Sequence, residues 1–479
     1  MKRFLMILVA MTATLMIVPA ANAVTINVST TADEYGASGG SCSLREAITA
    51  AQTDAAFDGC PAGSGADVIA IPAGEYRITR AGDDEDSNVT GDFDVIGTGA
   101  LTIQPASGNA KVLVDGKGID RVIDQQGDSS LSIRNLQVKG GAITKIEDGG
   151  GIRNNVGTLT VEGATVSGNS SAYSGGGIAV YDTLSMVNGT LSGNSADGSG
   201  GGLYVTGGAS ANVRSSTITA NAADADSLVN GDGGGFSGLA STVTLVNVIN
   251  AGNEDRSALP ADRSPDCASD PNFFPRYVLT TQAMGPVPCL VGFNPGTSQV
   301  VPDAMIGPLA DNGGQTPTHA LLAGSLAIGT GGTLAPDQCP ATDQTGRTRP
   351  AGSCDKGAVQ FVEPTPPGTL ALKIAKVQPK PLKLKRGRKA KVVRITVRST
   401  GSAAVQNVKL CLRPSKAVKK AVKVKGKRCR KVGTLGGSKT LKVRIRAKKK
   451  AKKKSFRIKA VLTGTGAGKK TGTIKVKVR

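Results

Sequence analysis

The carboxylates best suited to chemistry gather in one short stretch of the sequence. The stretch contains Asp83, Asp84, Glu85, Asp86, Asp92 and Asp94. Clustered carboxylates can hold Ca²⁺, or they can serve as acid and base in glycan cleavage. The first four are contiguous, which is typical of a solvated loop and not of groups that converge from adjacent strands. We therefore predict no catalytic residue and treat Asp83, Asp84 and Asp86 as a candidate Ca²⁺ site.

His319 is the only histidine of the chain. No nucleophile motif or carboxylate partner can be tied to it in the sequence, so we interpret it as a packed, hydrogen-bonded side chain and not as a general base. A cluster of charged residues lies within or next to the segment between Cys339 and Cys354. We interpret this cluster as a set of buried ion pairs, called the ionic clasp below. Its members are Asp343, Arg347, Arg349 and Asp355.

Other common kinds of site are disfavoured. The glycine triplets of the chain precede strands and not helices, so they do not form a phosphate-binding loop. There is no C-x-x-C spacing that would indicate zinc. Tyr181 and Tyr204 stand at different distances from their glycine triplets, and with Tyr173 they do not favour a sugar-stacking platform. We predict no cofactor.

A repeated unit occupies the middle of the chain. Each unit opens with a glycine triplet and ends in an asparagine, with a period of 25 to 33 residues. The triplets start at Gly149, Gly175, Gly200 and Gly233, and the asparagines are Asn169, Asn194, Asn221 and Asn253. Apolar residues inside a unit alternate in short runs, as in Leu159 and Val161, which is the periodicity of a strand.

Units of this kind must stack on one another, because several short strands without a helix cannot bury an apolar face alone. The sequence therefore predicts an all-β fold with a right-handed parallel β-helix of the pectin-lyase-like kind. The glycines are expected where no Cβ fits. The asparagines are expected to form a ladder of side-chain amides, with ordinary turn residues as the alternative.

The N-terminus predicts export. Residues 1–23 combine a positive start, an apolar run from Phe4 to Val18 and an Ala21-Asn22-Ala23 cleavage site, which is the pattern of a signal peptide. No other stretch is long and apolar enough for a membrane span. Cysteine usage agrees with an oxidising compartment, and pairing between sequence neighbours predicts four disulfides. These are Cys42–Cys60, Cys267–Cys289, Cys339–Cys354 and Cys411–Cys429.

Charge divides the chain into two parts. The net charge is +22, yet 39 of the 58 Lys and Arg residues and none of the 36 Asp and Glu residues lie from Pro364 onward. The remainder is acidic, with 19 basic side chains against 36 acidic ones. A proline-rich linker at residues 363–368 separates the two parts.

The basic part, residues 369–479, alternates apolar and cationic residues in strand-like runs such as Leu441 to Arg446. We predict an immunoglobulin-like β-sandwich that binds polyanions, with solubilising charge as the alternative. With Phe456 as the only aromatic residue, the part has no stacking platform for bases, so we predict no specific nucleic-acid binding. The predicted polyanion-binding residues are Lys442, Arg444, Arg446, Lys448, Lys449, Lys450, Lys452, Lys453 and Lys454.

Two motifs carry a family resemblance. Residues 42–48 read Cys-Ser-Leu-Arg-Glu-Ala-Ile, in which Ser43 and Glu46 form a capping box for a short helix that could cover the end of a coil. This stretch resembles the CSLREA domain at the start of exported bacterial β-helix proteins. Residues 307–321 and 343–359 resemble the choice-of-anchor Q segment that follows such β-helices, although Lys356 stands where that family usually has an apolar residue. The glycine and asparagine repeats also resemble those of polymorphic outer membrane proteins.

The resemblance implies a pectin-lyase-like β-helix exposed at a bacterial cell surface. We divide the chain into a signal peptide (1–23), a CSLREA-type cap (24–66), the β-helix (67–300), a choice-of-anchor Q-like segment (301–362), the linker and the basic sandwich. The sequence favours a secreted, non-catalytic surface protein that is held by anionic envelope polymers or polysaccharide. The alternative is a polysaccharide lyase or glycoside hydrolase acting on acidic glycans. An autotransporter-like passenger is disfavoured, because lipid would reject the uniformly basic strands.

Overall fold

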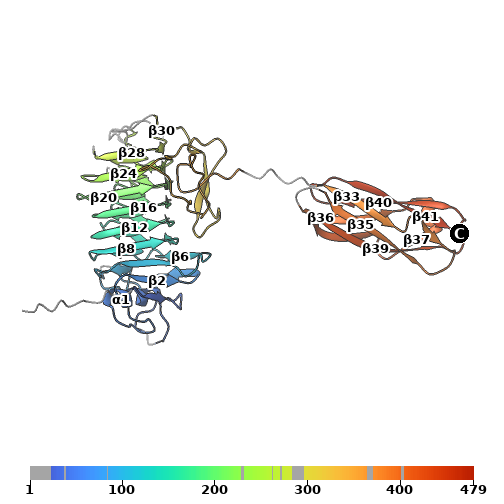
Figure 1. The fold of residues 1–479 in the computed structure, drawn as a ribbon, viewed down its shortest axis with the longest axis horizontal. Coiled ribbons are helices and arrows are strands. Elements are labelled where there is room, and N and C mark those ends of the chain that lie inside the picture. The colour runs from blue at the N-terminus through green and yellow to red at the C-terminus, as the bar shows by residue number, and fades with distance from the viewer. Residues whose placement is uncertain are drawn as a thin grey trace, which may run out of the picture. The chain divides into compact units, whose positions relative to one another are not determined.

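The chain forms two compact units, Met1–Val362 and Glu363–Arg479, which are described separately. The computed structural model describes residues 23–36, 39–82, 85–227, 231–260, 263–269, 272–282, 296–363, 371–400 and 404–479. The predicted signal peptide therefore lies almost wholly outside the described residues. Figure 1 shows the unit before the linker as a stack of short strands.

Parallel strands of successive coils build the sheets of this stack. The first sheet contains β1 (Thr25–Asn27), β2 (Asp67–Ile71), β5 (Leu101–Pro105), β8 (Ser129–Arg134), β12 (Gly157–Glu162), β16 (Thr183–Val187), β20 (Ser210–Arg214), β24 (Thr242–Val246) and β28 (Phe273–Arg276). The second contains β3 (Gly74–Arg77), β6 (Val112–Asp115), β9 (Gln137–Lys139), β13 (Thr165–Ser167), β17 (Thr190–Ser192), β21 (Thr217–Thr219), β25 (Ile249–Asn250), β29 (Leu279–Thr280) and β30 (Gln299–Val300).

Two shorter sheets complete the coils. The third contains β4 (Phe93–Val95), β7 (Ile123–Gln125), β11 (Ile152–Asn154), β15 (Ile178–Val180), β19 (Leu203–Val205), β23 (Phe236–Gly238) and β27 (Cys267–Ser269). The fourth contains β10 (Ala142–Ile143), β14 (Ser170–Ser171), β18 (Ser195–Ala196), β22 (Ala222–Ala223) and β26 (Glu254–Asp255). The prediction of an all-β fold with a stacked parallel β-solenoid is confirmed.

The core follows from the register of the strands. Leu159 of β12 pairs with Leu184 of β16, which in turn pairs with Ala211 of β20, and all three side chains are buried. Equivalent apolar residues thus lie above one another and form one continuous core along the coils.

The glycine triplets lie where neighbouring coils approach most closely. A Cβ on Gly177 would lie only 2.4 Å from the carbonyl oxygen of Gly202 on the next coil. Gly151 and Gly202 face the same restriction, each at 2.5 Å. No larger residue fits such a contact, which explains the repeated glycine.

The asparagines form the predicted ladder. Asn169 donates through its side-chain amide to Asn194 Oδ1 at 2.9 Å, Asn194 donates to Asn221 Oδ1 at 2.9 Å, and Asn221 donates to Asn253 Oδ1 at 3.0 Å. The same oxygens accept from backbone N–H groups of the preceding asparagine. All four side chains are buried, so the ladder satisfies polar groups inside the coil.

A helix covers the first coils. Helix α1 (Leu44–Thr53) begins after Ser43, and both bonds of the capping box with Glu46 are present. Leu44, Ala47 and Ile48 pack into the solenoid core. Figure 1 shows α1 at the blue end of the stack. Arg45 is fully buried; it pairs with Asp33 at 2.7 Å and donates to the carbonyls of Gly91 and Asp92. The stack starts earlier than predicted, because β1 already pairs with β2.

Residues 301–362 run along the second sheet as a strap. The strap contains the antiparallel pair β31 (Ile306–Ala310) and β32 (Thr318–Leu321). Its Gln344 bonds to Thr165 and Thr190, while its Gly332 donates to Asn247 of a later coil. The strap therefore ties several coils together, which no local pattern of the sequence indicates.

The described cysteines form disulfides between sequence neighbours. Cys42–Cys60, Cys339–Cys354 and Cys411–Cys429 are bonded. Cys267 is also disulfide-bonded, and its predicted partner Cys289 lies outside the described residues.

Two antiparallel sheets with a shared apolar core form the unit after the linker. The first contains β33 (Leu372–Gln378), β35 (Lys391–Ser399), β39 (Ser438–Ala447) and β37 (Val422–Lys425). The second contains β34 (Leu382–Leu384), β41 (Lys470–Val478), β40 (Ser455–Thr463), β36 (Val405–Arg413) and β38 (Cys429–Leu435), with β34 paired in parallel to β41. A short helix, α2 (Lys416–Ala421), was not predicted.

Candidate functional site

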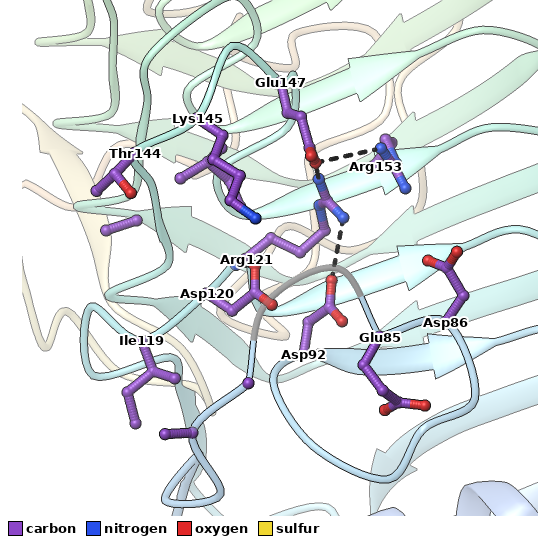
Figure 2. A pocket seen from close by; sticks show the side chains of 14 residues that line it. Glu85, Asp86, Asp92, Ile119, Asp120, Arg121, Thr144, Lys145, Glu147 and Arg153 are labelled. Carbon is purple, nitrogen blue, oxygen red and sulfur yellow. Dashed lines mark hydrogen bonds and ion pairs between the residues drawn. The ribbon is translucent and has the colours of Figure 1, made fainter.

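A cavity of about 540 Å³ opens beside the third sheet of the solenoid. Figure 2 shows carboxylates and guanidinium groups converging on it. The polar residues of its wall are Glu85, Asp86, Asp92, Asp120, Arg121, Thr144, Lys145, Glu147 and Arg153. They come from successive coils, so the stacking of the solenoid assembles the site.

Register explains why these charges meet. The central residues of β4, β7 and β11 are Asp94, Asp124 and Arg153, and the parallel pairing places them directly above one another. Asp92 and Arg121 lie just before β4 and β7, so they are close to each other for the same reason. One column of the third sheet thus carries two carboxylates and a guanidinium on adjacent coils.

Arg121 is the centre of the ion-pair network. Its Nη1 lies 3.1 Å from Asp92 Oδ2 and 2.9 Å from Asp124 Oδ2, and its Nη2 lies 2.9 Å from Glu147 Oε2. Only 5% of the Arg121 side chain is exposed. A guanidinium group offers planar donors to several carboxylates at once, which suits this position.

Arg153 closes the network on the next coil. Its Nε donates to Asp124 Oδ1 at 3.0 Å, its Nη2 pairs with Asp124 Oδ2, and its Nη1 lies 3.7 Å from Glu147. Asp124 is fully buried and has both arginines as partners. Asp120 has no ion-pair partner among the described residues, although its Oδ1 accepts the backbone N–H of Arg121 at 2.7 Å.

Burial shifts the protonation of these carboxyls. It raises the pKa of Asp92 well above the ordinary value, and the nearby charge of Asp94 adds to the rise. Burial likewise raises the pKa of Asp120 and brings that of Asp94 to about 7. Loss of hydration disfavours the charged form, and here it outweighs the stabilising arginine. The site therefore places carboxyls with a raised pKa beside the ion-paired Asp124 and Glu147.

Three carboxylates, one of them in the cavity wall, could hold a cation. Oxygens of Asp86, Asp94 and Asp124 lie within 4.8 Å of one another. The amide Nε2 of Gln126 donates to Asp86 at 2.6 Å, to Asp124 at 3.0 Å and to Asp94 at 3.4 Å. A hydrogen-bond donor thus fills the space between the oxygens that a metal ion would share.

The structure corrects the interpretation of the acidic stretch. Asp83 and Asp84 lie outside the described residues, whereas Asp86 joins buried Asp94 and Asp124 and not a purely solvated run. Of the contiguous run, only Glu85 and Asp86 are described, and both line the cavity. The later carboxylates lie against the next coil through the register of β4 and β7, in which Asp94 pairs with Asp124.

Sequence reasoning missed Asp120, Arg121, Asp124, Glu147 and Arg153. The signal was present, because Phe93-Asp94-Val95, Ile123-Asp124-Gln125 and Ile152-Arg153-Asn154 occupy equivalent positions. Of these three segments, only the one with Arg153 follows a glycine triplet, which starts at Gly149. Aligning the earlier coils with the repeat by their apolar residues would have placed the three charged residues in one column.

Tyrosines lie next to the cavity wall. Tyr181 donates to Asp148 through its hydroxyl group, and Asp148 follows Glu147 directly. Burial, with a smaller contribution from the charge of Asp148, raises the pKa of both Tyr181 and Tyr204. Tyr173 belongs to the same group and is 48% exposed. The different spacing of these residues in the sequence therefore did not prevent them from gathering.

His319 and the expected ionic clasp belong to the strap. His319 is buried, with Nε2 2.8 Å from Ser192 Oγ and Nδ1 2.7 Å from the carbonyl of Gly307, and burial lowers its pKa. The prediction that these residues form ion pairs is wrong. Arg349 instead donates hydrogen bonds to the backbone carbonyls of Asp355 and Gly357. The Asp343 carboxylate accepts backbone N–H groups, among them that of Arg347.

The basic unit presents cations on the outer faces of both sheets. Cross-strand partners in the first sheet are Lys373–Arg398, Arg394–Lys442, Lys425–Arg444 and Lys423–Arg446. Those in the second are Lys383–Lys477, Arg457–Lys475, Lys409–Lys431 and Arg413–Lys459. Like charges directly opposite one another destabilise a sheet. The predicted residues Lys448, Lys449, Lys450, Lys452, Lys453 and Lys454 lie in the exposed turn between β39 and β40.

Comparison with known proteins gave no matching family model and no similar curated sequence. In the part of the chain that the structure describes, no helix is long and apolar enough to cross a membrane. The solenoid and the disulfides fit a secreted extracellular protein.

Proposed function

We propose that this is a secreted bacterial surface protein whose basic unit attaches to anionic envelope polymers and whose solenoid is displayed from that attachment. The solenoid is then a right-handed, pectin-lyase-like β-helix with a CSLREA-type cap and a choice-of-anchor Q-like strap, followed by an immunoglobulin-like sandwich. The signal-peptide pattern and the disulfides support export.

The observation that carries this proposal is the pairing of cations across strands in both sheets of the basic unit. Each opposed pair costs stability in the isolated unit. A polyanion offsets this repulsion by placing negative charge between the cationic side chains of neighbouring strands. Solubility does not require the cations to lie opposite one another, whereas a polyanion with regularly spaced charges can bind such rows.

The test uses the full chain and beads that carry poly(glycerol phosphate), with neutral dextran beads as the control. We expect retention on the phosphate polymer at low salt and release near 1 M salt, where screening leaves only about 3 Å of electrostatic reach. Replacing the six lysines between residues 448 and 454 by glutamine should weaken retention. Retention that persists at high salt contradicts electrostatic attachment.

A second candidate function is favoured by the cavity. Asp92 and Asp120 are buried carboxyls with raised pKa, and they line the same cavity as Glu147, with Arg121 between Asp92 and Glu147. A protonated carboxyl beside an ionised one is the pair that glycoside hydrolysis requires. We therefore propose hydrolysis of a glycan as the alternative role of the solenoid.

Cleavage is tested by incubating the full chain with glycan polymers and measuring new reducing ends. Asp120→Asn should abolish their formation while leaving the unfolding temperature unchanged. Unsaturated uronate ends would indicate a lyase instead. Absence of both products over a panel of neutral, acidic and amino-sugar polymers would leave display as the role of the solenoid.

A further inference from the structure

We propose that the cavity beside the third sheet binds a glycan with free amino groups, and not an acidic glycan, which was the substrate of the alternative function predicted from the sequence. This inference rests on the second candidate function for its location, but it concerns binding and holds with or without cleavage.

The wall of the cavity is rich in carboxyl groups. The cavity is lined by the carboxylates Glu85, Asp86, Asp92, Asp120 and Glu147. Its cations are Arg121, Lys145 and Arg153. Carboxyl groups therefore outnumber the cations, and oxygens of two more, Asp94 and Asp124, lie within 4.8 Å of an oxygen of Asp86. Such a site attracts a cationic ligand and repels a uronate.

The cations of the wall already have partners. Arg121 is engaged by Asp92, Asp124 and Glu147, and Arg153 by Asp124 and Glu147. Lys145 also has an interaction of its own. A uronate carboxylate in contact with these guanidinium groups would add a negative charge beside the carboxylates that already pair with them. An ammonium group instead meets Asp120, which lacks an ion-pair partner among the described residues and whose ionised form a bound cation favours.

Hydrogen bonding indicates that the ligand also offers acceptors. Arg121 is almost completely buried, yet its Nε has no acceptor among the described residues. A buried donor without a partner is costly, so a group that accepts from this guanidinium stabilises the site. A sugar provides ammonium or hydroxyl donors for the carboxylates and hydroxyl or ether oxygens as acceptors.

The tyrosines distinguish a glycan from a small polyamine or a basic peptide. Tyr181 donates to Asp148, which follows the cavity residue Glu147, and Tyr204 lies near Tyr181 and Tyr173. A sugar polymer that leaves the cavity in this direction meets aromatic rings on which its apolar faces can pack. The apolar side chains of the wall, Ile119 and Ile143 with small residues, offer little to the side chains of a peptide.

The experiment measures binding to the full chain by calorimetry. The probes are a glucosamine hexamer, its N-acetylated counterpart, spermine and an oligogalacturonate. We expect the free-amino hexamer to bind roughly tenfold tighter than the acetylated one, since one close charge pair is worth at least this much. Added salt should weaken its binding. Oligogalacturonate should bind the basic unit, so its affinity should not change in cavity variants.

Two variants and one control locate the site. Asp120→Asn should lower the hexamer affinity roughly tenfold, and Tyr204→Ala should lower it while leaving spermine affinity unchanged. The control is Glu162→Gln, which removes an exposed carboxylate of the first sheet. Melting temperatures confirm that each variant is folded.

Equal affinity for the acetylated and free-amino hexamers overturns the role of the amino group. Equal affinity for spermine and the hexamer, insensitive to Tyr204→Ala, overturns the glycan in favour of a polyamine. No effect of Asp120→Asn removes the cavity as the site. Binding of the hexamer without new reducing ends upholds this inference while ending the hydrolase candidate.

Discussion

Asp94 is a buried carboxyl whose pKa is raised to about 7 by burial and by neighbouring carboxylates. Its ordinary value is 3.8, so the folded state binds the proton more tightly than the unfolded state does. The stability that this group contributes is fully present below pH 4 and is lost as the pH rises through 7. We expect Asp94→Asn to raise the free energy of unfolding at pH 8 by on the order of 2 kcal/mol, with little effect at pH 4.

Chemical unfolding of the full chain at pH 4, 6 and 8 checks this prediction through the transition of the solenoid. Asp128→Asn is the matched control, because Asp128 is exposed in a nearby turn. An unchanged pH dependence in Asp94→Asn would show that other carboxyls of the network set the titration.

Lys356 is a buried cation without a hydrogen-bond partner among the described residues. Burial lowers its pKa from 10.5 to about 8, so the unfolded state holds the proton more tightly. Stability should therefore rise as the pH increases from 8 to 10.5, and the full cost is present at pH 7. Lys356→Met should stabilise the chain at pH 7 by roughly 1–3 kcal/mol and should remove the rise at high pH.

Calorimetry at pH 7 and pH 9.5 separates the two states of this lysine. Lys117→Met serves as the control, because Lys117 is exposed on the same unit. Destabilisation by Lys356→Met at pH 7 would mean that the ammonium group has a stabilising role in the strap. The sequence flagged this position only through the family resemblance, since no periodic pattern marks the packing of the strap.

At the scale of elements, the asparagine ladder couples each coil to the next. Asn194 Oδ1 accepts the backbone N–H and the side-chain amide of Asn169, and its own amide donates to Val166 and Asn221. Asn194→Ala leaves several of these buried groups without partners. We expect the free energy of unfolding of the solenoid to fall by about 3 kcal/mol.

Denaturant midpoints of the full chain measure this loss. Asn212→Ala, on an exposed face of β20, should change stability by less than about 0.5 kcal/mol. Equal effects of the two substitutions would contradict the ladder as a source of stability and would favour ordinary turn residues.

The elements also show how far sequence reasoning reached. Local patterns of the sequence predicted three elements. The alternation of Leu159 and Val161 indicated the strands, the repeated asparagine indicated the ladder, and Ser43 with Glu46 indicated the capped helix α1. The column of Asp94, Asp124 and Arg153 was not recognised, because its coils lack most of the glycine signal. The path of the strap depends on contacts such as Gln344 with Thr165, between residues far apart in the chain. No periodicity encodes such a contact.

At the scale of the whole molecule, the two compact units should unfold as separate transitions, and a polyanion should act on only one of them. The aligned cations of the basic unit repel one another, for example Arg394 with Lys442 and Arg457 with Lys475. A polyanion that binds the native faces stabilises that unit by mass action and relieves the repulsion.

Calorimetry of the full chain at low salt should show one transition rising by roughly 5 °C with excess polyphosphate. Neutral dextran should move neither transition, and Lys442→Gln with Arg444→Gln should identify the transition of the basic unit by reducing its shift. Polyphosphate that raises the solenoid transition instead, or that moves neither, would contradict attachment through the basic unit.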